Sequence, residues 1–319
     1  MIKLSAYAII FCEMKGIFNM GFSNKKRHHH TDKSIQRVKL ISGAYLLPSY
    51  LGVTLFFVLP FLVVIYYALV DNPISKEFVF FDNFINVFKN NAFQLAVKNT
   101  LVFSFTAVPL VVILSLLVAF ALDKAIPFKS RIRAALLTPM MVPIASVILI
   151  WQVLFHYNGV INNVLVQLGE GKIDWFKSEY APVVVIILFV WKNLGYNMIL
   201  FMAALANIPK EIIEVATLES ATKWQVFIHI KLRYISSSLL FVTILSLINS
   251  FKVFREVYLL TGKYPYDSLY LLQHYMNNTF QSLDYQKLSA AAIIMSLFMI
   301  VLIGLLFFAE NVVGKDLEN

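Results

Sequence analysis

The residue types that carry catalysis, bind metal ions or hold nucleotides do not occur at the spacing that such chemistry needs. The six histidines form no metal-ligand pattern within an apolar segment, and the lone Cys12 excludes a cysteine-based metal site. The segment Gly169-Glu-Gly171-Lys172 is no phosphate-binding loop, because Val166 occupies the place of the first glycine and Ile173 that of the hydroxyl residue. We therefore expect a protein that is not an enzyme and that holds neither a metal nor a cofactor, ATP included.

Recognition of a polar solute is the chemistry that the sequence does offer, in an apolar segment where polar side chains usually face a cavity or one another. Asn193 and Asn197 are four residues apart and share a helix face, as do Lys192 and Tyr196. Amides, hydroxyls and aromatic faces suit a sugar, and hydrogen bonding between helices is an equally weighted alternative. Lys192 either extends its ammonium group to the membrane surface or favours an anionic solute. The candidate solute path comprises Lys192, Asn193, Tyr196, Asn197, Asn249 and Ser250.

Contact with a partner protein is indicated by loop 207–233, which is expected to fold into two short helices. Asn207 is expected to cap the first helix, with Glu211 and Glu214 near its positive end, and Thr222 to cap the second. An apolar patch rimmed by charge usually marks a protein contact, and helices lying in the lipid interface are the alternative. The apolar residues that share a face are Ile212, Val215 and Ala216 in the first helix and Trp224, Phe227 and Ile228 in the second.

The elements that must position these residues are membrane-spanning helices. The chain has 319 residues, of which 59% are apolar and 14% charged, whereas a soluble domain is roughly half apolar and a quarter charged. Its apolar residues gather into runs of about 20, the length that a helix needs to cross a bilayer. Four prolines, at 60, 109, 139 and 143, are expected to kink their spans. We expect an all-α polytopic membrane protein with six transmembrane helices, at 46–70, 99–122, 134–155, 182–206, 234–251 and 288–309.

The distribution of basic residues predicts the orientation of these spans. With the N-terminus in the cytoplasm, the cytoplasmic segments carry 17 Lys and Arg residues and the outer loops carry 9. Both termini are therefore expected in the cytoplasm. The net charge of +9 reflects this topology, so no nucleic-acid partner is expected, and the basic run 25–30 is expected to face anionic lipid.

The expected organisation is a cytoplasmic tail (1–45), a six-helix membrane domain (46–309) and a second cytoplasmic tail (310–319). Residues 1–20 resemble a signal peptide only slightly, because their apolar stretch is short and no cleavage site follows it. Met14 and Met20 are alternative first residues, and no function is expected for the residues before them.

Loop 207–233 also carries a family motif. Glu214-Val-Ala216-Thr-Leu-Glu219-Ser-Ala221, followed by Phe227 and Ile230, resembles the E-A-A loop of binding-protein-dependent ABC importer permeases. In that family the pattern is E-A-A-x-x-D-G-A, then a Phe and an Ile-x-x-Pro. The departures are Val215 for Ala, Glu219 for Asp, Ser220 for Gly and Arg233 for the closing Pro. A left-handed backbone at residue 220, which Gly would allow, costs Ser on the order of 1 kcal/mol.

The resemblance extends over roughly residues 40–309 as an ordered set of short motifs. These are similar to the sugar-type permease subunits of maltose, glycerol-3-phosphate and multiple-sugar importers. The motifs are Leu46-Leu-Pro48, Phe81-Asp-Asn-Phe84, Asn99-Thr-Leu101, Pro139-x-x-x-Pro143, Trp151-x-x-Leu-Phe155, Ile208-Pro209-Lys-Glu211, Leu260-Thr-Gly262-x-x-Pro265 and Tyr285-x-x-x-Ser-Ala290.

The resemblance implies a permease with the type I ABC importer fold, in a bacterial cytoplasmic membrane, that moves an oligosaccharide or polyol-like solute inward. Its implied partners, besides lipid, are a second permease subunit, two cytoplasmic ATPase subunits that bind the ATP, and an extracytoplasmic solute-binding protein at loops 71–98, 156–181 and 252–287. Loop 207–233 is implied to couple ATPase closure to movement of the spans, with Glu214 making the main ATPase contact. The coupling residues that the resemblance implies are Glu214, Ala216, Glu219, Ser220, Ala221 and Phe227.

Two functions of other classes are weighed against this interpretation. An ion-coupled secondary transporter would need an acidic residue or a histidine within a span, and the predicted spans contain neither. A membrane assembly protein without transport activity would leave the loop around Glu214 without a role.

Overall fold

The computed structural model describes residues 32–72, 75–123 and 127–314, with side chains described between 41 and 311. Cys12, the alternative starts Met14 and Met20, the basic run 25–30 and residues 315–319 lie outside the described residues. Within the described ranges the regular structure is helical, apart from an isolated bridge between Val70 and Phe78. The prediction of an all-α fold is confirmed.

The chain divides into two compact units, Met1–Phe61 and Leu62–Asn319. In the first, α2 (Asp32–Val53) leads into a π-helical turn, η1 (Thr54–Val58), and into the start of α3 (Leu59–Leu69). Pro60 has no backbone N–H, so the helical hydrogen-bond pattern is interrupted beside it. The π-turn lies directly before this proline and places the N–H of Leu59 on the carbonyl oxygen of Thr54.

Among the described residues, up to six segments are long and apolar enough to cross a membrane, and the third is broken. Five continuous helical segments are long and apolar enough to cross a membrane, and the sixth candidate is a pair, α6 (Lys129–Met141) and α7 (Ile144–Leu154), bent by 98°. The break lies at Val142 and Pro143, which both have extended ψ angles, because proline disfavours a helical residue before it. The continuous segments are Ile41–Leu69, Asn91–Asp123, Ala181–Ala206, Ser236–Thr261 and Tyr285–Asn311.

The spans are longer than predicted, and the extra length changes which charges lie within them. Helix α5 (Asn91–Asp123) begins before the predicted residue 99, and the fifth span continues from α13 (Ser236–Phe251) into α14 (Phe254–Thr261). This span therefore includes Glu256. The prediction that no span contains an acidic residue is wrong, because the apolar run ends at residue 251 whereas the helical segment continues to 261.

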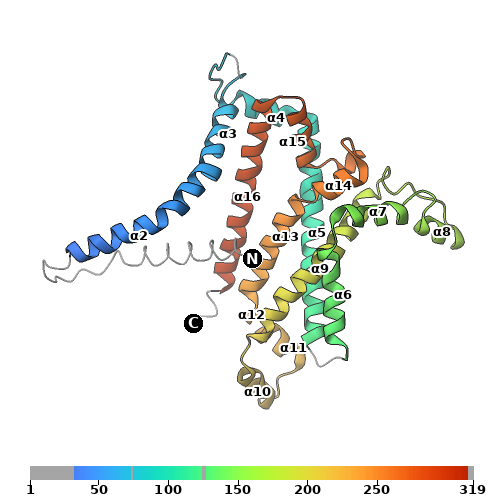
Figure 1. The fold of residues 1–319 in the computed structure, drawn as a ribbon. Helices are drawn as coiled ribbons and strands as arrows, with labels where there is room; N and C mark the ends of the chain where they lie inside the picture. Colours follow the sequence, from blue (N-terminus) through green and yellow to red (C-terminus); the bar gives the residue numbers. More distant parts are fainter. Residues whose placement is uncertain (1–31, 73–74, 124–126, 315–319) are drawn as a thin grey trace. The chain divides into compact units, whose positions relative to one another are not determined.

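The second unit is a bundle built around α5, α9 (Ala181–Ala206), α13 and α16 (Tyr285–Gly314) (Figure 1). Its core lies between α5, α9 and α13, where Val111, Phe201 and Val242 are fully buried. Helix α6 crosses α9 at Gly195, where an added Cβ would lie 1.9 Å from the carbonyl oxygen of Leu136. Only glycine allows this close approach of the two backbones, so α6 and α9 form one wall of the bundle.

Short helices lie at opposite ends of this bundle (Figure 1). One end carries α4 (Asp82–Lys89) and α15 (Leu272–Gln281). The other end carries loop 207–233, with α10 (Lys210–Leu218), α11 (Lys223–Gln225), a π-turn η2 (Val226–Lys231) and α12 (Leu232–Tyr234). Two further elements, α8 (Val160–Gln167) and η3 (Asp267–Leu269), belong to the predicted outer loops. The loop predicted to meet an ATPase thus lies away from α4 and α15.

Candidate functional site

Loop 207–233 folds into two short helices, as predicted, but one of the two predicted caps is wrong. Helix α9 continues to Ala206, and Asn207 caps its C-terminal end, so Pro209 instead stands before α10. Thr222 does cap α11: its Oγ1 accepts the Gln225 N–H at 3.3 Å, and the Gln225 Oε1 accepts the Thr222 N–H at 2.8 Å. This capping box fixes the residue at which the second helix begins.

The turn between the two helices has a left-handed residue at the position where the family pattern has glycine. Ser220 has φ = 62°. Its N–H donates to the carbonyl oxygen of Thr217 at 3.1 Å, and the N–H of Ala221 donates to that of Ala216 at 2.9 Å. These two bonds form a Schellman motif, whose left-handed position usually holds glycine. Serine there stores on the order of 1 kcal/mol of strain.

One side of loop 207–233 is attached to the end of α5. The rings of Phe227 and Phe120 meet edge to face, with centroids 4.7 Å apart. Lys231 Nζ lies 2.7 Å from Asp123 Oδ2, and Ile213 packs against the bundle core. These contacts join the loop to a long membrane helix, so a force on the loop reaches that helix.

The other side of the loop exposes large apolar side chains. Leu218 is 85% exposed, Trp224 67% and Val215 54%, and Glu214 is exposed beside them. Trp224 stacks on Phe227 with ring centroids 5.3 Å apart, so its position is fixed by the anchored side of the loop. Apolar area of this kind on a charged surface marks a protein contact.

A hollow of about 380 Å³ lies between the two helices of the loop. Four of the six predicted coupling residues line it, namely Ala216, Glu219, Ser220 and Ala221. Glu214 lies outside this hollow, and Phe227 packs against α5. The structure therefore brings most of the predicted coupling set to one surface and gives Phe227 an anchoring position.

The candidate solute path separates into two groups. Lys192, Asn193 and Asn249 line a cavity of about 470 Å³ between α6, α9, α13, α14 and α15. Asn249 Nδ2 donates to Asn193 Oδ1 at 3.2 Å, which links α13 to α9 at the cavity wall. Tyr196 is half-buried and does not line this cavity.

Asn197 and Ser250 instead connect helices within the core. Asn197 Nδ2 donates to Ser246 Oγ at 2.8 Å, and the hydroxyls of Ser250 and Ser104 lie 2.8 Å apart. Both predicted residues are buried, with at most 1% of their surface exposed. The alternative of hydrogen bonding between helices describes these two residues, because neither has surface left for a solute.

Sequence reasoning identified Lys192 but missed the other charged residues of this cavity. Glu256 is 6% exposed and forms an ion pair with Lys192 across α14 and α9. Arg255, Lys252 and Gln273 also line the cavity. The sequence signal was the spacing of residues 252, 255 and 256, which share a helix face at i, i+3 and i+4. No cluster of three or more side chains suited to a metal ion occurs in the described part of the chain.

His274, next to Gln273 in α15, adds no charge to this region at neutral pH. Its ring is fully buried, 4.6 Å from the ring of Phe254, and burial lowers the pKa of His274 to about 4. Its Nδ1 accepts the N–H of Leu271 at 3.2 Å. The cations of the cavity are therefore lysine and arginine.

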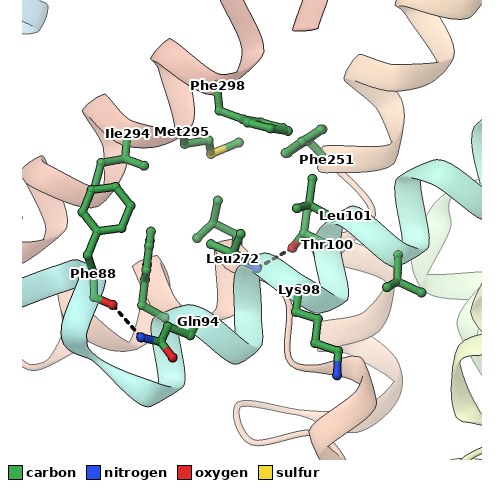
Figure 2. A pocket seen from close by; sticks show the side chains of 13 residues that line it. Phe88, Gln94, Lys98, Thr100, Leu101, Phe251, Leu272, Ile294, Met295 and Phe298 are labelled. Carbon is green, nitrogen blue, oxygen red and sulfur yellow. Dashed lines mark hydrogen bonds between the residues drawn. The ribbon is translucent and has the colours of Figure 1, made fainter. Parts of the chain in front are cut away.

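A larger cavity, of about 680 Å³, is apolar and contains none of the predicted site residues (Figure 2). Of the three polar side chains on its wall, Gln94 and Thr100 already have partners, and Lys98 is the third. Gln94 Nε2 donates to the carbonyl oxygen of Phe88 at 2.8 Å, and Thr100 Oγ1 accepts the N–H of Leu272 at 2.8 Å. The cavity around Lys192 and Asn193 is consequently the better candidate for a polar solute.

Comparison with known proteins identifies relatives of the whole membrane bundle. Residues 84–319 match the family described as binding-protein-dependent transport system inner membrane component. The sulfoquinovosyl glycerol transport system permease protein of Agrobacterium fabrum is 29% identical over 266 residues, which cover 81% of this chain and 86% of that protein. The lactose transport system permease protein of Rhizobium radiobacter is 27% identical, with 72% and 80% covered. The osmoprotective compounds uptake permease protein of Synechocystis sp. is 26% identical, with 68% and 80% covered.

The fold has a solved counterpart in a bacterial ABC transporter involved in the import of the acidic polysaccharide alginate. The match has a TM-score of 0.76 and 22% identity, and it covers 89% of this chain and 99% of the other. The family match, the permease relatives and this shared fold agree. The chain belongs to the family of binding-protein-dependent transport system inner membrane components, and it is a transmembrane permease subunit of an ABC importer.

Proposed function

We propose that this permease subunit carries a sugar, as an oligosaccharide or polyol-like solute, into the cytoplasm, and that separate ATPase subunits power it through loop 207–233. Permeases named for lactose, for sulfoquinovosyl glycerol and, in Bacillus subtilis, for arabinooligosaccharides are 27–29% identical to this chain. Their names favour a sugar over an ion or an amino acid as the transported solute.

The observation that carries the proposal is the two-sided construction of loop 207–233. Its exposed side presents Leu218 and Trp224, which would be costly in water without a partner. Its other side is fixed to α5 through Phe120 and Asp123. An ATPase subunit bound to the exposed side would therefore move α5 as it closes, and Glu214 lies at the rim for a charged contact.

The orientation follows from this assignment. With loop 207–233 in the cytoplasm, α4 and α15 face the outside, where loops 71–98, 156–181 and 252–287 meet a solute-binding protein. A solved alginate transporter of the same fold, at 22% identity, is in complex with a pentasaccharide-bound periplasmic protein. The exposed apolar surfaces of α5 and α16, on which Phe105 and Ile300 are each 66% exposed, then contact lipid and a second permease subunit.

Charge reversal at Glu214 tests the ATPase contact. Glu214→Lys is expected to leave the protein folded in the membrane, to abolish co-purification with the ATPase and to stop uptake, because a like charge or an unpaired charge at an interface costs several kcal/mol. Glu211→Lys makes the same charge change one turn earlier on α10 and should retain the ATPase. Unchanged co-purification of the Glu214→Lys variant would show that the coupling role is wrong.

Uptake in membrane vesicles tests the energy source. We expect ATP to drive uptake when an uncoupler has collapsed the proton gradient. An ion-coupled transporter gains one argument from the structure, namely the acidic Glu256 within a span. However, Glu256 is held in an ion pair with Lys192, so it is not a free carboxylate that could bind a coupling ion. Loss of uptake on uncoupling, with ATP held constant, would contradict the ATP-driven proposal.

A further inference from the structure

The cavity around Lys192 and Asn193 holds more positive than negative charge. Three cationic side chains line it, those of Lys192, Lys252 and Arg255, and one carboxylate, that of Glu256. The ion pair of Lys192 with Glu256 uses up the carboxylate. Among the described residues, Lys252 and Arg255 form no ion pair. The cavity therefore carries two positive charges that have no partner within the described chain.

The two cations lie in the C-terminal part of a candidate membrane span, and both side chains are exposed in the isolated chain. Both lie at the junction of α13 and α14, inside a segment apolar enough to span a membrane. Arg255 is in the first turn of α14, where the helix dipole opposes a positive charge. Cations within a span usually mark the path of a solute or an ion. Exposed on the cavity wall and without a carboxylate partner among the described residues, the two cations are free to meet a negatively charged group that enters the cavity during transport.

We propose that the cavity between α9, α13, α14 and α15 binds an anionic sugar in transit, with its acidic group on Lys252 and Arg255. The proposal rests on the proposed sugar transport and narrows it to sugars that bear a carboxylate, sulfonate or phosphate. Arginine suits these groups because its guanidinium donates two parallel hydrogen bonds to a planar anion. Lysine adds a mobile point charge.

The remaining wall suits the sugar part of such a solute. Asn193, Asn249 and Gln273 supply amide groups that can hydrogen-bond hydroxyls, and Leu188 and Phe189 supply apolar surface. The volume of about 470 Å³ is within the range of small-ligand sites. Lys192 does not itself select the anion, because Glu256 neutralises it and holds its ammonium group.

Uptake by the complete transporter, reconstituted with its binding protein, tests the inference with a mixed probe, so the solute need not be identified beforehand. The probe is a mixture of neutral oligosaccharides from starch and acidic oligosaccharides from pectate and alginate digests, together with sugar phosphates. Mass spectrometry of the vesicle contents identifies the accumulated members. We expect acidic members to accumulate.

Variants then connect the selection to the two cations. Lys252→Gln and Arg255→Gln should each raise the KM for the accumulated acidic sugar about tenfold with little change in kcat, because each removes a charged hydrogen bond. Arg255→Lys should recover part of the affinity. Lys129→Gln, which removes a lysine from α6 outside the cavity, should change neither constant.

The outcomes separate the two proposals. Accumulation of neutral sugars alone would overturn the anionic class and leave sugar transport standing, whereas accumulation of no sugar would overturn both. The inference would also be overturned if acidic sugars accumulated with the same KM in the two Gln variants. Lys252 and Arg255 would then bind lipid headgroups or the second permease instead of the solute. Loss of the second permease on purification of either variant would identify that last case.

Discussion

Loop 207–233 and the cavity around Glu256 place their side chains in opposite ways. The loop exposes Leu218 and Trp224 at the surface of the protein, whereas the cavity holds a part-buried ion pair and is lined by two further cations within a candidate membrane span. In each region the side chains are mismatched to their surroundings. Apolar groups are costly in water, and charged groups are costly in a bilayer.

Under the proposed function, the two regions meet different partners. A mismatch with water is relieved by another protein, which buries the apolar area. A mismatch with the bilayer is relieved by a counter-charge, which Glu256 supplies to Lys192 and which a solute would supply to Lys252 and Arg255. Substitutions in the cavity should therefore change stability and solute affinity, and substitutions on the exposed side of the loop should change association alone.

The largest expected effect is at the buried ion pair. Glu256→Gln leaves Lys192 charged and without a partner, which should lower the free energy of unfolding by about 3 kcal/mol. Unfolding in detergent, followed by circular dichroism, measures this loss. The double variant Lys192→Met, Glu256→Met should recover most of it, because no buried charge remains.

The half-exposed pair of Lys287 with Asp284 is the matched control for this substitution. Asp284→Asn should cost less than about 1 kcal/mol, as surface pairs do. If Glu256→Gln lowered the free energy of unfolding as little as this control does, the ion pair of the cavity would be solvated. The cavity would then not differ from the loop in the burial of its charges.

The next effect is acid sensitivity at His274, beside the cavity. The pKa of this buried histidine falls from 6.5 to about 4, so the unfolded chain binds more protons between these values. The contribution of neutral His274 to the free energy of unfolding is therefore fully present above pH 6.5. It decreases as the pH drops toward 4, by up to about 1.4 kcal/mol per pH unit. Unfolding midpoints between pH 7.5 and 4.5 measure it.

The variant His274→Asn keeps an acceptor for the N–H of Leu271 but does not titrate in this window. It should lose most of the acid sensitivity. A pH profile identical to that of the unmodified protein would show that another group causes the acid sensitivity.

On the loop, Leu218→Asp should separate association from stability. Leu218 is 85% exposed, so its replacement should change the free energy of unfolding by less than about 0.5 kcal/mol. Loss of an apolar contact at an interface should weaken ATPase binding by about 2 kcal/mol. Co-purification and a binding titration measure this loss of ATPase binding.

Leu168→Asp is the control for this substitution. Leu168 is 74% exposed in a predicted outer loop, so its replacement should leave ATPase binding unchanged. Equal effects of the two variants would contradict a docking surface on the loop.

The smallest effect is at the left-handed turn of the loop. Ser220→Gly should stabilise the folded loop by about 1 kcal/mol, because glycine adopts φ = 62° without strain. Slower hydrogen exchange of the Ala221 amide would report this gain. Ser220→Ala keeps the Cβ and should give none.

Much of this architecture could be predicted from local sequence. Six apolar runs predicted six spans, and Thr222 formed the predicted cap together with Gln225. Pro143, one of four prolines expected to kink a span, lies at the break in the third, whereas Pro109 and Pro139 lie inside continuous helices. Each of these depends on residues within a few positions of one another. The Asn207 prediction failed because Asn207 closes the last turn of α9, where its N–H donates to the carbonyl oxygen of Ala204.

The candidate solute path shows the limit of local reasoning. Helical spacing placed Asn193 and Asn197 on one face, yet the first lines a cavity and the second hydrogen-bonds to Ser246 in the core. A shared face says nothing of which neighbouring helix covers each turn. That neighbour decides whether an amide meets a solute or another helix.

The amino-acid sequence by itself determined the membrane class, the number and order of the apolar spans and the two-helix fold of loop 207–233, because hydrophobicity and capping act over short distances along the chain. Only the tertiary structure decided that Glu256 lies within a span and neutralises Lys192. These residues are 64 positions apart, and the desolvation of a charge depends on the helices packed around it.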